Sequence, residues 1–250
     1  MTMSRIIAGA LAAALTACSG PAAQRATDTQ RATEPQLAER PVTGGDDVAS
    51  TPAADTAGVI LFLGTSLTAG YGLGAEYAYP AVIQDWLDSA GLPYRVSNAG
   101  ISGETSAGGL RRLEWSLQSP VAVLVLELGA NDGLRGIDPG HMRANLDSII
   151  RLTLSRYPDS DIVIAGMQAP PNLGERYTNA FRRVFADLAE EHDAALVPFL
   201  LAGVAAVDSL NQEDRLHPTA AGQRIVAANV WRVLEPLLRN RARRARSGAP

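Results

Sequence analysis

The sequence predicts one three-layer α/β domain built on a five-stranded parallel sheet. Apolar runs alternate with helical patterns from about residue 58 to residue 240, and this alternation is typical of a sheet covered by helices. Several runs are nearly continuous in Val, Ile and Leu, as expected for parallel strands that are buried on both faces. The chain has 250 residues, of which 46% are apolar and 19% charged, so it can form one soluble domain with a sizeable core.

The strands are expected at five apolar runs, which are residues 59–63, 94–97, 121–128, 161–167 and 195–199. The helices are expected between and after them, at residues 80–90, 104–117, 139–157, 174–191 and 219–238. Local chemistry supports several helix ends. Gly91 and Pro93 end the first helix, and Pro158 ends the third. Asp138 is an N-cap that is followed by proline in the first helical position.

The N-terminal segment is expected to direct export and to lie outside the fold. Arg5 precedes an apolar stretch at residues 6–15, which is too short to span a bilayer stably. The following Leu15-Thr16-Ala17-Cys18 resembles the bacterial lipobox, in which the cysteine becomes the lipidated first residue. We therefore expect a signal peptide at residues 1–17 and a lipid on Cys18, the only cysteine of the chain. An ordinary signal peptide cleaved nearby, with Cys18 incidental, is the alternative.

Two segments are expected to be disordered. Residues 18–57 are rich in Ala, Thr, Pro, Gly, Asp and Gln and show no periodicity, which indicates a tether. Residues 241–250 are arginine-rich without an apolar face, which indicates a solvated basic tail; weak attraction to anionic lipid or lipopolysaccharide is the alternative. Residues 58–240 remain as the folded domain. The expected location is the bacterial outer membrane, and the periplasm or the medium if no lipid is attached.

Composition and motifs exclude several function classes. The net charge of −4 argues against a general nucleic-acid binder. The chain has no Gly-x-Gly-x-x-Gly motif, so we expect no dinucleotide and no other cofactor. We also expect no metal. His141 and His192 lie in polar surroundings near helix ends, and no other His or Cys is available beside Asp214 and His217 to complete a ligand shell. We expect a monomer.

Ser66 is the strongest candidate for a nucleophile. It follows the apolar run 59–63 in a glycine-rich turn, at the end of a predicted buried strand. A hydroxyl reacts near neutral pH only with a general base and a carboxylate that orients the base. His217 and Asp214 can supply both, and Pro218 places the imidazole on a stiff turn. A lone serine at a strand end is more often a turn residue, so the hypothesis depends on these partners.

Two further strand ends carry candidates for an oxyanion hole. Ligands of open parallel sheets bind outside the carboxyl ends of the strands. Gly100 follows the second strand, and the missing side chain lets backbone N–H groups approach a substrate oxygen. Asn131 follows the third strand and brings an amide donor. Each of the two, taken singly, is a common turn residue.

Together these blocks resemble the SGNH (GDSL) hydrolases. The blocks are Gly64-Thr65-Ser66-Leu67, Gly100, Gly129-Ala130-Asn131-Asp132 and Asp214-Arg215-Leu216-His217-Pro218. The resemblance covers residues 58–240 and is closest to the bacterial thioesterase, lysophospholipase and arylesterase branch. It implies a flavodoxin-like α/β/α fold, with Ser66 as nucleophile, His217 as base and Asp214 as its orienting partner. It also implies an oxyanion hole made by the N–H groups of Ser66 and Gly100 and the side chain of Asn131.

One position departs from the family pattern. Thr65 stands where the family usually has Asp, a residue regarded as shaping the turn. Threonine can make a similar but weaker local hydrogen bond, so the triad is expected to stay intact. The geometry of the oxyanion hole is the feature that this replacement affects.

The resemblance implies a serine esterase that acts on carboxylic esters with short or medium acyl or aryl groups, or on thioesters or lysophospholipids. The loop after the fourth strand offers Met167, Pro170 and Leu173 as candidates for an acyl-binding wall; a plain connecting loop with Met167 in the core is the alternative. Two other functions stay open. One is a cell-envelope carbohydrate O-deacetylase or acyltransferase with the same triad, and the other is a non-catalytic lipid-binding module, which the presence of all three triad positions disfavours.

Overall fold

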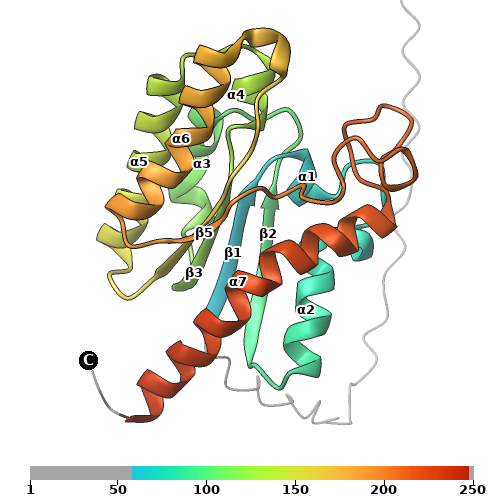
Figure 1. Ribbon diagram of the computed structural model, residues 1–250. Coiled ribbons are helices and arrows are strands. Elements are labelled where there is room, and N and C mark those ends of the chain that lie inside the picture. The colour runs from blue at the N-terminus through green and yellow to red at the C-terminus, as the bar shows by residue number, and fades with distance from the viewer. Residues whose placement is uncertain (1–57, 248–250) are drawn as a thin grey trace, which may run out of the picture. The chain divides into compact units, whose positions relative to one another are not determined.

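A parallel sheet of five strands forms the middle layer of the structure, a computed structural model that describes residues 58–247. The strands are β1 (Gly58–Gly64), β2 (Tyr94–Gly100), β3 (Val121–Glu127), β4 (Asp161–Ala165) and β5 (Ala195–Val197). They lie in the order β2-β1-β3-β4-β5, and Figure 1 shows β1 between β2 and β3. The chain reverses its direction of winding at β1, and ligands of open α/β sheets bind beside the carboxyl ends of the strands at such a point.

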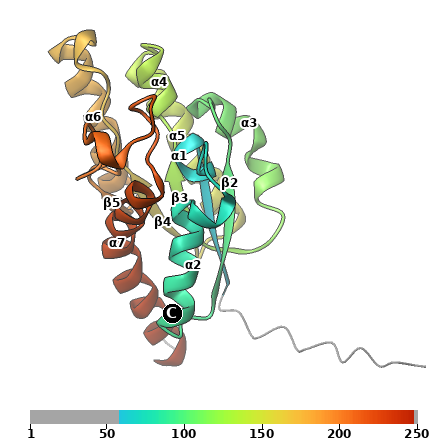
Figure 2. The same ribbon diagram turned by 90° about the vertical axis from the view of Figure 1, so that its right-hand side faces the viewer.

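Five long helices cover the two faces of the sheet. The first face carries α3 (Ser106–Ser116), α5 (Pro139–Arg156) and α6 (Glu175–Glu191). The other face carries α2 (Tyr79–Ser89) and α7 (Ala220–Ser247), which lie side by side in Figure 2. Because helices cover both faces, all seven residues of β3 are buried. The predicted three-layer architecture is therefore confirmed.

The short elements lie in the connecting segments. They are α1 (Ser66–Ala69), α4 (Ala130–Leu134) and the 3-10 turns η1 (Ala75–Tyr77), η2 (Pro171–Leu173) and η3 (Asp208–Leu210). None of these five was predicted, since three to five residues are too few to show a helical period. The boundaries of the predicted strands differ by up to three residues from those observed. The largest difference at the site is in β2, which continues from the expected end at residue 97 to Gly100.

The expectation of a disordered tail at residues 241–250 is wrong for most of that segment. Helix α7 continues to Ser247, and ion pairs join its last turns to the start of β4. Arg241 donates to Asp161 at 2.9 Å and to the carbonyl of Asp159, and Arg244 donates to Asp161 at 3.3 Å. The positive charges are evident from the sequence, but the carboxylate that pairs with them lies 80 residues from Arg241 along the chain.

The proposed signal peptide, the lipid site at Cys18 and the proposed tether all precede Gly58 and lie outside the described residues. Within residues 58–247, the structure contains no helix with the length and apolar character needed to cross a membrane.

Candidate active site

Ser66 lies directly after β1 and is the first residue of α1. Thr65 caps this short helix, because its Oγ1 accepts a hydrogen bond from the Leu67 N–H at 3.4 Å. The turn is tight: a Cβ atom at Gly64 would lie 2.0 Å from Thr68 Oγ1, so only glycine fits there. The half-buried Ser66 hydroxyl is thus held at the carboxyl end of a central strand, as the sequence predicts.

Ser66, His217 and Asp214 meet in one place. Ser66 Oγ lies 2.9 Å from His217 Nε2, and His217 Nδ1 lies 2.6 Å from Asp214 Oδ2. Asp214 Oδ1 also accepts the backbone N–H groups of Leu216 at 2.9 Å and His217 at 3.0 Å. The hydrogen bond from the imidazole and these two backbone donors lower the pKa of Asp214 to about 2. The carboxylate is therefore charged at any pH at which the protein would work.

A closed turn presents His217. Its carbonyl accepts the N–H of Gln212 at 2.7 Å, and Asn211 and Pro218 form an isolated antiparallel bridge. Arg215, at the tip, has a φ of 59°, an uncommon conformation for a residue with a side chain. The expected stiff elbow before Pro218 is therefore present, and backbone hydrogen bonds as well as proline hold it.

Two side chains that the sequence analysis missed join this turn to the Ser66 segment. Gln223 on α7 is buried; it donates to the Leu67 carbonyl at 3.2 Å and accepts the Tyr79 N–H at 3.0 Å. The ring of Tyr71 lies against the imidazole of His217, with centroids 4.5 Å apart. The role of Gln223 could have been predicted, because a glutamine on the apolar face of a helix is buried and must then find hydrogen-bond partners.

Three residues with available donors line the space beside the Ser66 hydroxyl. Asn131 lines the cavity, and its Nδ2 donates one hydrogen to the Glu104 carbonyl at 3.0 Å, which leaves its second N–H for a ligand. The N–H groups of Ser66 and Gly103 have no acceptor among the described residues, and both residues line the same cavity. These donors can together bind an oxygen that carries negative charge.

The prediction of Gly100 as an oxyanion donor is wrong. Gly100 is still in β2, where it pairs with Gly64, and its N–H donates to Asn98 Oδ1 at 3.0 Å. It lines a different groove and is absent from the cavity around Ser66. Gly103 occupies the expected place instead, with a φ of +77° that favours glycine. The sequence analysis chose the wrong glycine because β2 runs three residues beyond its predicted end.

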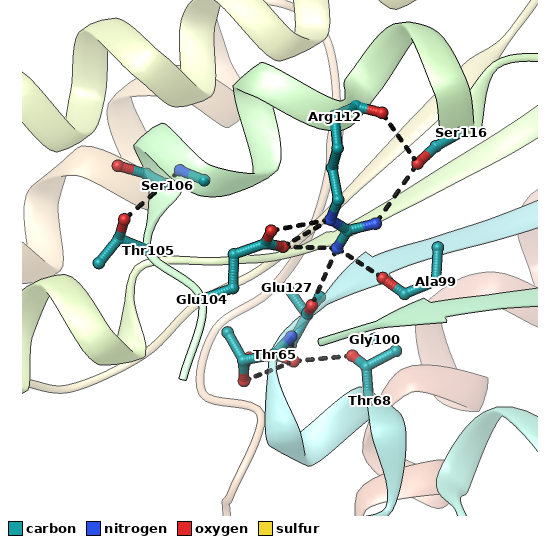
Figure 3. Close-up of polar contacts among 12 residues, drawn as sticks. Thr65, Thr68, Ala99, Gly100, Glu104, Thr105, Ser106, Arg112, Ser116 and Glu127 are labelled. Atoms are coloured by element: carbon teal, nitrogen blue, oxygen red, sulfur yellow. Dashed lines mark hydrogen bonds and ion pairs between the residues drawn. The ribbon is translucent and has the colours of Figure 1, made fainter. Parts of the chain in front are cut away.

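A buried carboxylate lies under the Ser66 turn. Glu127, at the end of β3, is 0% exposed. It accepts hydrogen bonds from the Thr65 N–H at 2.8 Å, the Thr65 hydroxyl at 3.1 Å and the Thr68 hydroxyl at 2.7 Å (Figure 3). Thr65, the residue that departs from the family pattern, therefore donates to a carboxylate, which the usual aspartate could do only when protonated.

We predict that Glu127→Gln changes how stability depends on pH. Burial raises the pKa of Glu127 above 4.5, and the three hydrogen bonds only partly offset this. The folded chain thus holds this proton more tightly than the unfolded chain, so its contribution to stability is complete below pH 4.5 and declines as the pH rises through the folded-state value.

Thermal melts from pH 5 to pH 9 would test this prediction. The melting temperature of the wild type minus that of Glu127→Gln should decrease as the pH rises, by about 2–4 °C for each kcal/mol of lost stability. Other groups titrate alike in both proteins and cancel in the difference. A difference that stays constant with pH would contradict the raised pKa.

The cavity beside Ser66 and His217 has a volume of about 600 Å³, within the range of small-molecule sites. Its walls are mainly apolar, and within residues 58–247 no Asp, Glu, Lys or Arg lines it. The apolar walls are formed by Leu67, Tyr71, Ala130, Leu134, Met167, Ala169, Pro170, Phe199, Leu201, Ala205 and Leu216.

The three predicted wall residues are only partly brought together. Met167 and Pro170 line the cavity, whereas Leu173 does not. Leu173 ends the 3-10 turn η2 and lies toward Gly136, whose Cβ position would be 3.9 Å from the leucine side chain. The loop turns away after Pro170, so the other wall comes instead from Phe199 and Leu201, after β5, which the sequence analysis did not identify.

One cluster of acidic residues and histidine lies elsewhere. Asp147, Glu191 and His192 are close enough to share an ion, but Arg143 and Arg151 already pair with the two carboxylates. His192 is almost buried, and its Nε2 lies 2.7 Å from Asp147. This arrangement joins α5 to the end of α6.

Comparison with known proteins adds an independent line of evidence. Residues 62–225 match the GDSL-like lipase/acylhydrolase family. Esterase TesA of Pseudomonas aeruginosa is 43% identical over 180 residues, which cover 72% of this chain and 89% of that protein. Thioesterase 1/protease 1/lysophospholipase L1 of Escherichia coli K12 is 38% identical over 189 residues, which cover 74% of this chain and 86% of that protein.

A solved structure is similar as well. The psychrotrophic esterase EstA from Pseudoalteromonas sp., inhibited by monoethylphosphonate, superposes with a TM-score of 0.67 at 32% identity. The match covers 73% of this chain and 99% of that one. The similarity therefore extends over the whole of that domain.

Proposed function

This chain belongs to the GDSL-like lipase/acylhydrolase family, and we propose that it hydrolyses carboxylic esters with Ser66, His217 and Asp214 as its catalytic triad. The observation that carries the assignment is the His217 imidazole, which lies 2.9 Å from the Ser66 hydroxyl on one side and 2.6 Å from the Asp214 carboxylate on the other. This is the arrangement that a serine nucleophile requires.

In the first step Ser66 Oγ attacks the ester carbonyl carbon while His217 Nε2 takes the hydroxyl proton. The carbonyl π electrons move to the oxygen, and Asp214 stabilises the imidazolium. The tetrahedral intermediate then collapses, the bond from carbon to the alcohol oxygen breaks, and His217 gives its proton to the leaving alcohol. The product is an acyl group on Ser66.

In the second step water takes the place of the serine hydroxyl. His217 removes a proton from water as the oxygen attacks the acyl carbon, and then returns the proton to Ser66 Oγ as the acid leaves. In both steps the N–H groups of Ser66 and Gly103 and the amide of Asn131 bind the oxyanion. Each such donor stabilises the transition state by about 3–4 kcal/mol.

The apolar cavity favours substrates whose acyl or aryl group is uncharged and apolar. Among the residues that the structure describes, no Arg, Lys, Asp or Glu lines its walls. An ionic group would therefore lose hydration there without gaining a partner. An acetyl group would leave most of the 600 Å³ unfilled, which favours short to medium acyl chains over carbohydrate deacetylation. A lysophospholipid could bind only with its phosphate outside these walls.

We predict that Ala205→Phe shortens the preferred acyl chain. Ala205 lines the cavity, and a phenyl group there would occupy space that a longer chain needs. With p-nitrophenyl esters from acetate to decanoate, kcat/KM for the longest good substrate should fall about 10–100-fold relative to that for acetate.

The exposed Ala202 lies three residues away, outside the cavity, so Ala202→Phe is the matched control and should keep the wild-type order of substrates. If Ala205→Phe also kept that order, the acyl chain would bind elsewhere. A wild type that prefers acetylated sugars to every p-nitrophenyl ester would favour the deacetylase function instead.

Covalent labelling tests the nucleophile. A fluorophosphonate should inactivate the enzyme by forming a bond from phosphorus to Ser66 Oγ with loss of fluoride, and peptide mass spectrometry should find the adduct on Ser66 alone. The similarity to an esterase inhibited by a phosphonate supports this choice of probe. An enzyme that hydrolyses esters while Ser66 stays unlabelled would refute the triad.

We further propose export and a lipid anchor, from the segment that precedes Gly58. The chain enters β1 at its amino end, and Ser66 lies past the carboxyl end of the same strand. Ser66 and its cavity therefore lie at the end of β1 opposite to the point where the chain enters the described fold. Mass spectrometry of the mature N-terminus should detect a diacylglyceryl-modified Cys18, and an unmodified Cys18 would exclude the anchor.

A further inference from the structure

Arg112 lies near the site but outside the cavity, and its guanidinium makes polar contacts with four residues. It lies on α3, and its side chain is 15% exposed. Nε donates to Glu104 at 2.9 and 2.7 Å, Nη2 donates to the Ala99 carbonyl at 2.7 Å and the Gly64 carbonyl at 3.3 Å, and Nη1 contacts Ser116 (Figure 3).

These partners belong to the segments that carry the proposed oxyanion donors. Gly64 is two residues before Ser66, and Glu104 directly follows Gly103. The Glu104 carbonyl also accepts the Asn131 amide at 3.0 Å. One guanidinium is therefore linked, through at most one further residue, to all three donors.

We propose that Arg112 is a positioning residue that holds these three donors in the geometry that binds the oxyanion. The inference rests on the proposed function of Ser66 as nucleophile. Arg112 does not line the cavity that contains Ser66; it borders a separate groove over β1, β2 and α3. Its effect on catalysis must therefore pass through the backbone segments that it connects.

The chemistry of arginine suits this role. A planar guanidinium presents five donors in fixed directions, so one side chain can bind a carboxylate and two carbonyls at the same time. Lysine carries the same charge on a flexible stem and has no such planar set of donors. The Glu104 carboxylate, 10% exposed, balances the charge, and loss of either partner would leave the other poorly solvated.

A positioning role predicts a change in kcat with little change in KM. The oxyanion exists only in the tetrahedral states, so misplaced donors weaken the transition state more than substrate binding. A displacement of about 1 Å at a catalytic group can cost about 100-fold. A role limited to stability would instead lower the melting temperature and leave kcat per folded molecule unchanged.

The test compares Arg112→Gln and Arg112→Lys with wild type, Ser66→Ala and the control Arg111→Gln on p-nitrophenyl butyrate. Arg111 is the neighbouring exposed residue of α3 and makes no hydrogen bond within the described part of the chain. For Arg112→Gln we expect kcat to fall about 10–100-fold with KM within about threefold. Arg112→Lys should lose at least about tenfold, and Arg111→Gln should match the wild type.

Two further readouts separate positioning from folding. Millimolar guanidinium chloride should restore part of kcat to Arg112→Ala by filling the vacated space, without effect on Arg111→Gln. The rate of fluorophosphonate labelling of Ser66 should fall in Arg112→Gln in proportion to kcat, because the phosphonyl oxygen uses the same donors.

The outcomes distinguish the two proposals. Wild-type kcat in folded Arg112→Gln or Arg112→Lys, with Ser66→Ala inactive, would overturn the role of Arg112 and leave the triad in place. Full activity in Ser66→Ala would overturn the proposed function itself. If Arg112→Gln did not fold, Arg112→Lys would decide the question, since it keeps the charge that pairs with Glu104.

Discussion

Ser66→Ala is expected to lower kcat for ester hydrolysis by about 10⁶-fold, or about 8 kcal/mol of transition-state stabilisation. The substitution removes the only atom that can form the acyl-enzyme while leaving the cavity and the oxyanion donors in place. His217→Gln should cost a similar factor, because an unactivated hydroxyl is a poor nucleophile. Substrate binding should change little, since neither group contributes much to the apolar walls.

The measurement is kcat on p-nitrophenyl butyrate for the two single variants, the double variant and a control. Residues of a triad act as a unit, so the double variant should be no worse than about tenfold below either single one. Ser89→Ala, on the exposed end of α2, should retain wild-type kcat. Hydrolysis by Ser66→Ala at more than about 1% of the wild-type rate would refute the mechanism.

The sequence was sufficient to predict that Ser66 and His217 lie together, although they are 151 positions apart in the chain. The reason is topological: residues that follow parallel strands share one edge of the sheet, and Pro218 marks a turn before a long helix. The choice of donor glycine failed, because strand ends are located from sequence only to within a few residues. Gly100 and Gly103 are only three residues apart. Gly100 lies in the sheet with its N–H already bonded, whereas Gly103 lines the cavity.

Contacts between distant segments account for most of what could not be predicted. Arg241 and Asp161 pair across the fold and extend α7, and no local pattern indicates this. Glu127 is a different case, because a carboxylate at the end of an otherwise apolar strand must find donors when it is buried. That requirement could have indicated the hydroxyls of Thr65 and Thr68, and with them a reason for threonine at position 65.

Asp214→Asn is expected to lower kcat by about 10⁴-fold, although it changes only one atom. Asp214 Oδ1 accepts two backbone N–H groups, so the carbonyl oxygen of asparagine must take that position. Its NH₂ group then faces His217 Nδ1, where Oδ2 now lies at 2.6 Å. The amide donates to Nδ1, and the ring proton moves to Nε2, where it blocks acceptance of the Ser66 proton.

The pH dependence of kcat distinguishes this tautomer effect from a loss of charge on Asp214 by protonation. The imidazole and two backbone donors hold the pKa of Asp214 at about 2, so in the wild type this carboxylate stays ionised from pH 4 upward. Titration of Asp214 therefore cannot account for any loss of wild-type activity between pH 4 and pH 8. Because asparagine does not titrate, kcat of Asp214→Asn should remain low across the whole range.

The control for this experiment is Asp208→Asn. Asp208 lies on the same connecting segment, is 84% exposed and is only 3.9 Å from the Arg215 guanidinium, so its replacement should leave kcat within about twofold, as expected for a weak surface pair. Asp214→Asn activity within tenfold of the wild type at pH 7 would show that His217 is oriented without the carboxylate. In that case the closed turn from Asn211 to Pro218 alone would hold the imidazole, and Asp214 would serve only to cap that turn.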